Sequence, residues 1–372
     1  MKIIFAAGGT GGHINPALAA AGEIRENYPD AEILFIGNAN KMEARLVPEA
    51  GFDFRTIKIS GFQRKISIQN IIRNIITVFL IFTSTFQVKK ILKDFKPDVV
   101  VGFGGYVSGP VVRSAAKMGI PTAIHEQNAY PGVTNKTLAK VVDKVMLTVA
   151  DAEKHLQPKN PCIVTGLPVR GELLRADRDF SRAELGVKDG STLILSMGGS
   201  LGAMTVNEAM VGYIAAKSGN KNLHFIHAYG QYGKWVPDKL KEKGVDASVC
   251  DNVELREYIN DMARCMSAAD LVICRAGASS LSELQAMGKP SVLIPSPNVA
   301  ENHQYHNAMA LVNNGAAVII EEKQLTAELF EKTLDELTSD KAKLEAIGKN
   351  ALAMAKPQAK KDIADIIVSL AK

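Results

Sequence analysis

The chain has 372 residues, of which 47% are hydrophobic and 22% charged; these values are ordinary for a soluble globular protein, and the length favours two domains over one. The net charge is +5, but residues 1–165 hold 20 Lys and Arg against 13 Asp and Glu, and the remainder holds 24 against 26. A basic N-terminal half suggests an anionic partner such as phosphates, nucleic acid or an acidic membrane surface, although simple solvation also accounts for it.

The four scattered cysteines form no C-x-x-C pair, which predicts buried, reduced thiols rather than a disulfide framework. The first residues lack the long apolar region and cleavage site of a signal peptide.

Short β-branched runs alternate with helical patterns along the whole chain. The expected strands of the first half are 2–8, 31–37, 98–105, 121–126, 144–149 and 161–166. Those of the second half are 192–199, 223–230, 253–259, 271–277, 290–296 and 316–320. Continuous apolar strands separated by helices predict parallel sheets covered on both faces.

The plan of the first strand and turn restarts near residue 191, where "LILSMGGSLGA" repeats the order strand, glycine turn, helix of "IIFAAGGTGGH". We therefore expect an α/β protein of two Rossmann-like domains, with residues 1–166 as the first and 167–352 as the second. The amphipathic segment 353–372 is expected to pack back on the first domain.

Four glycine- or serine-rich turns connect an expected strand to an expected helix. They are "GGTGGH" (8–13), "GFGGYVSGP" (102–110), "GGSLGA" (198–203) and "CRAGASSLSE" (274–283). Glycine lets a ligand approach the main chain, and the free N–H groups and positive dipole of a helix N-terminus suit phosphate. One such loop is a weak signal, because tight packing also explains glycine. Four of them at strand ends predict a phosphate-rich ligand.

Two common nucleotide-binding motifs are excluded. A dinucleotide fingerprint read from Gly9 has Ile14 in place of its third glycine and Asn38 in place of the acidic residue after the second strand. No glycine turn carries the G-K-[ST] of a P-loop. The pairs His303 with His306 and His224 with His227 have no third ligand, so we expect no bound metal and no cofactor.

Taken together, the motifs resemble the MurG family, the UDP-N-acetylglucosamine–N-acetylmuramyl-(pentapeptide) pyrophosphoryl-undecaprenol N-acetylglucosamine transferases. The motifs are "GGTGGHINPALA", "GFGGYVSGP", "HEQNAYPGVTNK", "GLPVR", "GGSLGA" and "CRAGASSLSELQAMGKPSVLIPSP...NHQYHNA", in order over almost the whole chain. The resemblance implies a GT-B fold, in which two Rossmann-like domains with parallel sheets face a cleft. It implies that the N-terminal domain holds the acceptor and meets the membrane, and that the C-terminal domain binds UDP-GlcNAc.

The reaction implied by the resemblance is an inverting transfer of GlcNAc from UDP-GlcNAc to the C4 hydroxyl of MurNAc in lipid I. The product would be lipid II, a precursor of peptidoglycan. The implied partners are UDP-GlcNAc, lipid I (an undecaprenyl-diphosphate-linked muramyl pentapeptide) and an anionic membrane surface, with no nucleic acid. Two alternatives stay open at this point: a UDP-GlcNAc 2-epimerase of similar fold, and a nucleotide-sugar-binding module without catalysis.

The resemblance also assigns roles to single residues. The implied UDP-GlcNAc contacts are Thr10, Gly11, Gly12, Asn128, Arg170, Ser200, Ile259, Ala278, Ser279, Ser280, Leu281, Ser282, Glu283 and Gln304. The loops expected to hold the acceptor diphosphate contain Gly9, Gly104, Gly105 and Tyr106. Three of these residues also have a simpler interpretation. Ile259 by itself suggests a core residue, Glu283 suggests a helix cap, and Arg170 suggests a solvated side chain in a linker.

Two side chains are candidates for the general base on the acceptor hydroxyl. His13 lies at a helix N-terminus, which disfavours its cation and leaves a neutral ring able to accept a proton. It could equally cap the helix or donate to phosphate. Glu126 is the second candidate, and it could instead orient His13 or form a structural strand end. The sequence does not choose between them.

The chain departs from the family pattern at several positions. "ASSLSE" places Ser280 where threonine is usual, His303 replaces a first glutamine, Leu201 stands where glutamine is frequent, and Ala129 replaces glycine. These changes bear on the sugar contacts rather than on the reaction.

The most apolar stretch is 65–90, with basic ends at Arg64, Lys65, Lys89, Lys90 and Lys93. Its longest unbroken apolar run, 78–82, predicts that it is too short to span a bilayer. Base rates favour a core helix, and the basic ends suit a helix lying on a membrane surface. Because the implied acceptor is a lipid, we expect peripheral association with the cytoplasmic face of the inner membrane.

Overall fold

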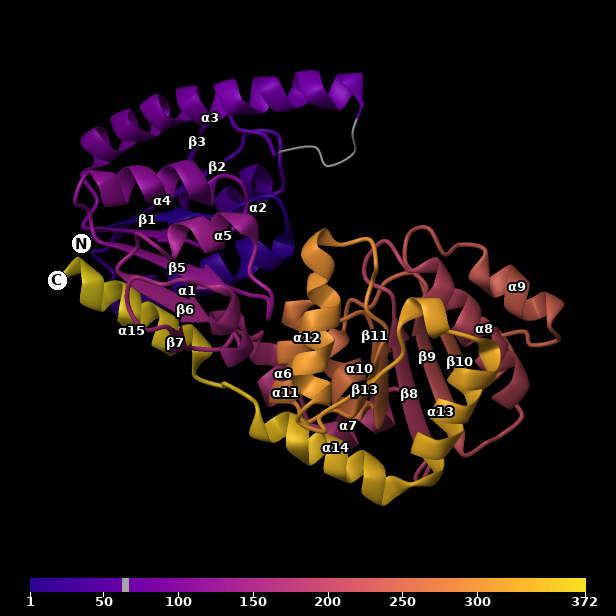
Figure 1. The fold of residues 1–372 in the computed structure, drawn as a ribbon. Helices are drawn as coiled ribbons and strands as arrows, with labels where there is room; N and C mark the ends of the chain where they lie inside the picture. The colour runs from indigo at the N-terminus through magenta and orange to yellow at the C-terminus, as the bar shows by residue number, and fades with distance from the viewer. Residues whose placement is uncertain (62–66) are drawn as a thin grey trace. The chain divides into compact units, whose positions relative to one another are not determined.

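The computed structural model describes residues 1–61 and 67–372, and the chain forms two compact units. Unit 1 consists of Met1–Pro168 together with Pro357–Lys372, and unit 2 is Val169–Lys356. Figure 1 shows a separate sheet with flanking helices in each unit. The expected fold class, an α/β chain with two parallel sheets, is confirmed.

Unit 1 is built on a seven-stranded parallel sheet in the order β3-β2-β1-β4-β5-β6-β7. Its strands are β1 (Lys2–Ala6), β2 (Glu32–Gly37), β3 (Asp53–Thr56), β4 (Val99–Gly102), β5 (Thr122–Glu126), β6 (Lys144–Leu147) and β7 (Ile163–Val164). Its helices are α1 (Gly11–Asn27), α2 (Glu43–Glu49), α3 (Ile68–Phe95), α4 (Ser108–Lys117), α5 (Val133–Leu138), the 3-10 helix η1 (Ala150–His155) and α15 (Ala359–Ala371).

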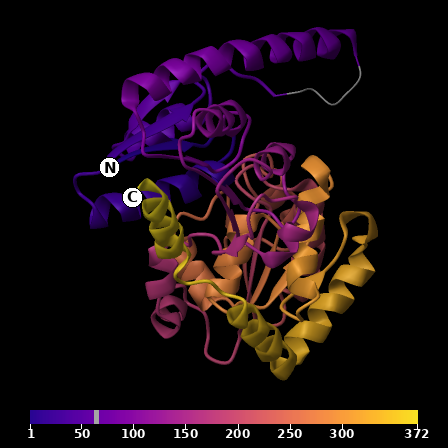
Figure 2. The same cartoon turned by 60° about the vertical axis from the view of Figure 1, so that its left-hand side comes forward.

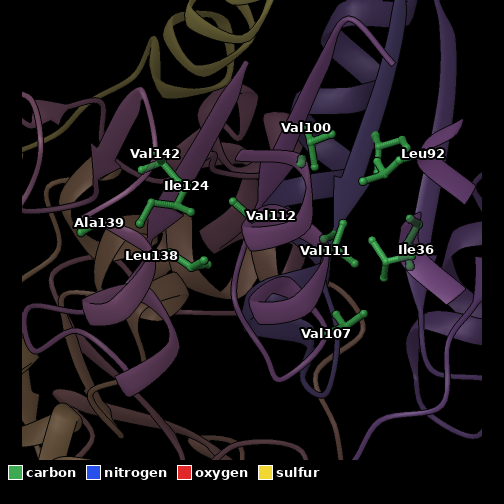
Figure 3. Close-up of a cluster of buried hydrophobic side chains, with 14 of the residues drawn as sticks. Ile36, Leu92, Val100, Val107, Val111, Val112, Ile124, Leu138, Ala139 and Val142 are labelled. Atoms are coloured by element: carbon green, nitrogen blue, oxygen red, sulfur yellow. The ribbon is translucent and has the colours of Figure 1, made fainter. Parts of the chain in front are cut away.

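Alternate residues of the central strands face two separate cores, which explains their unbroken apolar sequences. Ile4, Val100 and Ile124 point to one face, where they meet α4 and the C-terminal part of α3. Figure 3 shows this cluster, with Val111 and Leu92 reaching it from the two helices. Phe5 belongs to the opposite core, where its ring stacks between those of Phe35 and Phe103.

Unit 2 repeats the plan with a six-stranded parallel sheet in the order β10-β9-β8-β11-β12-β13. Its strands are β8 (Thr192–Met197), β9 (Leu223–Ala228), β10 (Val253–Arg256), β11 (Leu271–Cys274), β12 (Ser291–Leu293) and β13 (Val318–Ile319). Its helices are α6 (Gly171–Arg175), α7 (Arg178–Glu184), α8 (Met204–Lys217), α9 (Val236–Glu242), α10 (Met262–Ala268), α11 (Ala278–Ala286), α12 (His303–Val312), α13 (Ala327–Ser339) and α14 (Lys341–Ala353), with the 3-10 helices η2 (Ala300–Asn302) and η3 (Glu322–Gln324).

Every strand expected from the sequence is present in shortened form, and one strand was missed. That strand, β3, has the sequence DFRT and pairs with β2 at the edge of the sheet. Three of its four residues, Asp53, Arg55 and Thr56, have exposed polar side chains, so its sequence lacks the continuous apolar run of the central strands.

The core-helix alternative, which base rates favour for the apolar stretch 65–90, does not hold for the part of that stretch that the structure describes. Among the described side chains of the long helix α3, the buried ones form a narrow stripe: Thr77, Ser84, Val88, Ile91 and Leu92. Most of its large apolar side chains are exposed: Ile71, Ile72, Ile75, Ile76, Val78, Phe79, Ile81, Phe82 and Phe86. Figures 1 and 2 show α3 along the outside of unit 1.

The length estimate for this segment also needs correction. Within Gln69–Phe95 an 18-residue window has a mean hydropathy of 1.6, so by length and composition the helix could cross a membrane. Only 17% of that window is buried, whereas a core helix of a soluble protein would be mostly buried. The uninterrupted run 78–82 understated the length of the apolar segment, because single polar residues such as Asn74 lower the mean hydropathy only slightly. The basic end formed by Lys89, Lys90 and Lys93 is exposed, and Arg64 and Lys65 lie outside the described residues.

The last helix, α15, lies on α1 in unit 1. Its buried residues Ile363 and Ile367 join the core that also holds Ala17, Ala20 and Ile24 of α1. Small residues on α1 allow this close approach, and Lys360 adds ion pairs of 2.8 Å to Glu23 and 3.4 Å to Glu26. The C-terminal residues therefore stabilise the helix that carries His13.

Replacing Ile367 by alanine is expected to lower the free energy of unfolding by about 2–5 kcal/mol, because a fully buried isoleucine leaves a cavity. Urea unfolding followed by circular dichroism measures the effect. Ser369→Ala, at an exposed position on the same helix, is the control and should leave the value unchanged. An equal effect of both substitutions would contradict the packing of α15 described above.

Candidate functional site

His13 is held in one tautomer by the loop between β1 and α1. Its Nδ1 lies 3.0 Å from the carbonyl oxygen of Gly8 and 3.3 Å from Oγ1 of Thr10, the N-cap residue of α1. Because a carbonyl oxygen can only accept a hydrogen bond, Nδ1 carries the proton in the neutral ring. The lone pair of that ring is then on Nε2, the nitrogen that can accept a proton.

The second glycine loop packs directly against the first. A Cβ atom added to Gly104 would lie 2.7 Å from Cδ2 of His13, and one added to Gly105 would lie 2.3 Å from the carbonyl oxygen of Gly8. Both glycines also have positive φ angles, 101° and 79°. These two predicted diphosphate-loop residues thus permit the close contact of the two loops, and Tyr106 beside them is exposed.

Ser108, which the sequence analysis did not single out, connects the two loops from beneath. Its buried hydroxyl accepts a hydrogen bond from the Gly104 amide at 3.1 Å. The same oxygen lies 2.8 Å from the carbonyl oxygens of Ala6 and Gly104. A serine at the start of α4 resembles an ordinary helix-terminus residue in the sequence, so only the fold reveals that it fixes the loop beside His13.

Glu126, the other predicted base, has both carboxylate oxygens occupied. Oε1 accepts hydrogen bonds from the amide and the side chain of Asn128 at 2.9 and 3.3 Å. Oε2 accepts from the Gly132 amide at 3.2 Å and from the side chain of Asn135 at 2.8 Å. Burial raises the pKa of the Glu126 carboxyl, and these hydrogen bonds oppose that rise. The carboxylate therefore organises the loop 127–135, which includes the predicted sugar contact Asn128.

His125, next to Glu126, is fully buried and links three segments of unit 1. Its Nε2 lies 2.9 Å from the Gly166 carbonyl oxygen, and its Nδ1 lies 3.1 Å from Nε2 of Gln127, which also donates to the Phe103 carbonyl oxygen at 3.0 Å. The Nε2–H tautomer satisfies this arrangement. Desolvation by burial lowers the pKa of His125 to about 4, and the bond to Gly166 opposes the shift.

This burial predicts a loss of stability in mild acid. The unfolded-state pKa is about 6.5 and the folded one about 4, so between these values the unfolded chain binds more protons. The contribution of His125 is complete above pH 6.5 and is lost, by about 3 kcal/mol, as the pH falls toward 4. His227 of unit 2, whose pKa burial also lowers to about 4, acts in the same direction. Urea unfolding against pH should give a shallower slope for His125→Gln than for the wild type, whereas exposed His155→Gln should keep the wild-type slope.

In unit 2 the predicted donor residues other than Arg170 follow the carboxyl ends of parallel strands, either in the turn itself or in the first turns of the next helix. Ser200 is exposed in the turn after β8, where Gly202 has a φ of 84° and packs against the Tyr229 carbonyl oxygen. Ile259 is buried and belongs to the core, so its side chain is occupied by packing. Any ligand contact at position 259 would therefore come from the main chain.

Helix α11 begins directly after the turn that follows β11. Its N-cap is Gly277, and glycine has no side chain that could accept a hydrogen bond from the first turn. The main-chain N–H groups near Ala278, Ser279 and Ser280 therefore need another hydrogen-bond acceptor. Leu281 and Ser282 are buried beneath this turn, with Leu281 in the core of unit 2. The N-terminus of α11 thus presents N–H groups and two half-buried serines, which suits an anion.

Two of the predicted donor contacts are bonded to each other. Nε of Arg170 donates to Oε1 of Glu283 at 2.9 Å, and the Glu283 side chain is 14% exposed against 48% for Arg170. A more distant ion pair joins Arg170 to Glu172 at 3.4 Å. The arginine therefore orients the carboxylate, and Oε2 of Glu283 has no such contact with Arg170.

The loop before α12 positions Gln304. Its Oε1 accepts a hydrogen bond from the Ser296 amide at 2.9 Å, which fixes the direction of its NH₂ group. Glu301 and Asn302 just before the helix have φ angles of 55° and 50°, a strained region for residues other than glycine. His303, a departure from the family pattern, has its Nδ1 2.8 Å from the Ala300 carbonyl oxygen, and desolvation lowers its pKa.

Arg275 is a second residue that the sequence analysis missed. Its guanidinium donates to the carbonyl oxygens of Ile294 and Pro295 at 3.1 and 3.3 Å and to Thr205 Oγ1 at 3.4 Å, and it pairs with Glu322. It thereby connects the ends of β11 and β12 to α8. No short-range pattern signals this role, because these partners are 19 to 70 positions away in the sequence.

The four cysteines differ in burial. Cys265 and Cys274 are buried, and burial raises the pKa of each thiol to about 12; Cys162 and Cys250, expected to be buried, are instead half-exposed. Across residues 1–61 and 67–372 no group of three or more His, Cys, Asp or Glu side chains is arranged to hold a metal ion.

Comparison with known families covers both units. The model of the glycosyltransferase family 28 N-terminal domain matches residues 3–147, and that of the family 28 C-terminal domain matches residues 193–366. A domain built around the first two glycine loops is thus followed by one built around the last two. The fold and the arrangement of loops define a two-domain glycosyltransferase.

Full-length relatives identify the family within this class. The UDP-N-acetylglucosamine–N-acetylmuramyl-(pentapeptide) pyrophosphoryl-undecaprenol N-acetylglucosamine transferase of Acetivibrio thermocellus is 43% identical, covering 100% of this chain and 99% of the relative. The transferase of that name from Desulforamulus reducens is 42% identical over 98% of this chain and 97% of its own. The crystal structure of Acinetobacter baumannii MurG matches with a TM-score of 0.80 and 31% identity over 99% of both chains. The chain belongs to the MurG family.

The epimerase alternative shares the fold but not the sequence. UDP-GlcNAc 2-epimerase from Neisseria meningitidis, in a structure bound to UDP-GlcNAc, matches with a TM-score of 0.64 and 16% identity over 99% of this chain and 100% of the epimerase chain. Identity this low shows the common architecture alone, so the epimerase alternative is less supported than the transferase.

Proposed function

We propose that this protein is an inverting glycosyltransferase that moves GlcNAc from UDP-GlcNAc to the C4 hydroxyl of MurNAc in lipid I, giving lipid II for peptidoglycan synthesis. The observation that carries the proposal is the 42–44% identity to transferases of that name over 94–100% of the chain. The side-chain geometry of unit 1 supports it, because the imidazole of His13, with its Nδ1 3.0 Å from the Gly8 carbonyl oxygen, lies where two glycine loops meet.

In this proposal His13 is the general base and Glu126 organises the loop beside it. Nε2 of His13 takes the proton from the acceptor hydroxyl while the hydroxyl oxygen forms a bond to the anomeric carbon of GlcNAc. The bond from that carbon to the β-phosphate oxygen breaks, and its electron pair leaves with UDP. A single displacement of this kind inverts the anomeric centre. Glu126 is less suited to the role of base, since four N–H donors already occupy its oxygens.

Unit 2 is proposed to hold the donor. The amides and serines at the start of α11 would bind the diphosphate and stabilise the charge that develops on UDP. Ser200 would add a hydrogen bond to phosphate, the main chain at Ile259 would meet the uracil, and Glu283 would accept hydrogen bonds from the ribose hydroxyls. The amide of Gln304 would hold hydroxyls of the transferred sugar. In unit 1, Thr10, Gly11, Gly12 and Asn128 would contact the donor sugar.

Glu283→Gln is expected to weaken UDP-GlcNAc binding about tenfold, because a neutral amide accepts hydrogen bonds less strongly than a carboxylate and loses its ion pair with Arg170. Isothermal titration calorimetry with UDP-GlcNAc measures the dissociation constant. The matched control is Glu172→Gln, which removes the other and longer ion pair of Arg170 and should leave the affinity within twofold. If the two variants bind equally tightly, Glu283 is not a donor contact.

The membrane part of the proposal rests on α3. We propose that its exposed apolar face inserts into the cytoplasmic surface of the inner membrane as a peripheral anchor, with Lys89, Lys90 and Lys93 near anionic head groups. This location would bring unit 1 to the lipid-linked acceptor.

The function is tested with purified protein, UDP-GlcNAc labelled in the sugar, and a short-chain lipid I analogue. A labelled disaccharide on the lipid analogue is the expected product, and a chelator is expected to leave its rate unchanged. Recovery of labelled UDP-ManNAc without any disaccharide would instead establish the epimerase.

A further inference from the structure

Glu43 is a buried carboxylate that none of the predicted sites includes. It is the first residue of α2 and lies between the carboxyl ends of β1 and β2, with 1% of its surface exposed. Its Oε2 accepts a hydrogen bond from the Gly9 amide at 3.0 Å, and its Oε1 accepts one from the Asn38 amide at 3.0 Å. A glutamate that enters the interior of the unit to bind two loop amides is unusual, because desolvation of a carboxylate is costly.

The first of these hydrogen bonds reaches His13 through one peptide group. The N–H of Gly9 and the C=O of Gly8 belong to the same peptide plane. The N–H donates to the Glu43 carboxylate, and the C=O accepts from Nδ1 of His13 at 3.0 Å. Hydrogen bonds in a chain polarise one another, so an anion bound to the N–H makes the C=O a stronger acceptor.

The surrounding glycines keep this peptide group in place. A Cβ atom on Gly8 would lie 2.5 Å from Oε1 of Glu43, and one on Gly37 would lie 2.5 Å from Cγ of Glu43. On the other side, Gly105 approaches the Gly8 carbonyl oxygen so closely that a Cβ atom there would be 2.3 Å away. These close approaches leave no room for a side chain at Gly8, Gly37 or Gly105, so the peptide group is tightly packed on both sides.

We propose that Glu43 is a positioning residue that acts on His13 through the Gly8–Gly9 peptide group, holding the proton on Nδ1 and the lone pair on Nε2. The arrangement does the work of the carboxylate that pairs directly with histidine in many hydrolases, with one peptide plane inserted between the two side chains. The inference rests on the proposed function to the extent that His13 is the base.

The tautomer of His13 gives a test that does not depend on turnover. Full-length protein labelled with ¹⁵N-histidine is studied by NMR above neutral pH, and the His13 signals are assigned by their loss in His13→Asn. In the wild type the protonated nitrogen is expected to be Nδ1. Glu43→Gln should shift the tautomer ratio about tenfold toward Nε2–H, because a neutral acceptor polarises the peptide less. A wild-type ring protonated at Nε2, or an unchanged ratio in the variant, would overturn the proposal.

Kinetics separate positioning from a merely structural role. Glu43→Gln is expected to lower kcat about tenfold while the KM for UDP-GlcNAc changes less than twofold. The control is Asp143→Asn. The Asp143 carboxylate also accepts a backbone hydrogen bond, from the Thr122 amide at 2.9 Å. Thr122 is the first residue of β5, at the amino end of the strand, whereas Glu43 lies at the carboxyl ends of β1 and β2. Asp143→Asn should leave kcat within twofold of the wild type. Equal losses of kcat in the two variants would contradict the proposal. Wild-type protein that makes no disaccharide would instead contradict the proposed function, and the NMR result would then decide the role of Glu43.

Discussion

His13→Ala is expected to lower kcat by about a hundredfold to ten-thousandfold, the range that general-base catalysis contributes. The acceptor hydroxyl is a weak nucleophile until a proton is removed, and without His13 water would have to accept that proton. UDP binding is expected to stay within twofold, because the diphosphate and nucleoside contacts are proposed to lie in unit 2. The rate of disaccharide formation from UDP-GlcNAc and a lipid I analogue, with both substrates saturating, measures the effect.

His155→Ala is the matched control for this variant. His155 is a histidine of the same unit, it is exposed, and its ring packs on Tyr130 at a centroid distance of 4.5 Å. Its substitution should leave kcat within twofold. If His13→Ala keeps a third or more of the wild-type kcat, His13 is not the base, and Glu126→Gln becomes the next variant to measure.

The second large effect is expected on α3. Replacing Ile75, Phe79 and Phe82 together by serine should weaken binding to vesicles containing anionic lipid by more than about a hundredfold, since each buried large apolar side chain contributes about 1.5–3 kcal/mol. These side chains are 64–65% exposed and belong to no core cluster of unit 1, so the fold itself should be preserved. Sedimentation with vesicles measures the bound fraction.

A control variant removes exposed apolar residues from unit 2 instead: Tyr232, Val249 and Tyr258, each replaced by serine. It should bind vesicles as the wild type does. Turnover of a soluble, short-chain acceptor should be unaffected in the α3 variant. Unchanged vesicle binding after the α3 substitutions would refute the proposed anchor, and a lower unfolding midpoint would show that the exposed face also supports the fold.

The two faces of α3 illustrate why its location could not be inferred from the sequence. The buried stripe contains hydroxyl side chains, and Thr77 Oγ1 and Ser84 Oγ lie 2.9 Å from carbonyl oxygens one turn earlier, those of Arg73 and Ile81. The isoleucines and phenylalanines from Ile71 to Phe86 are exposed, whereas Ile91 belongs to the buried stripe. An apolar helix normally turns its apolar face inward, which is why base rates favour a core helix for such a sequence.

Site residues were visible in the sequence to the extent that their signal is local. A glycine turn between a strand and a helix has a recognisable order of residue types, so the loops at 8–13, 102–110, 198–203 and 274–283 could be located in advance. Ser108, Arg275 and Glu43 could not. Their hydrogen bonds join positions 102, 70 and 34 residues apart, and each is an ordinary helix-terminus or strand-end residue in its own segment.

The sequence by itself determined the two parallel sheets, the strand-to-helix turns and the family, because hydrophobic periodicity and glycine spacing are set by neighbours along the chain. Only the tertiary structure decided which nitrogen of His13 carries the proton and which groups donate hydrogen bonds to the oxygens of Glu126. It also decided that the apolar face of α3 is exposed and that α15 packs on α1. Each of these depends on which distant groups fold together, since a hydrogen bond or a buried face is completed by atoms that the local sequence does not contain.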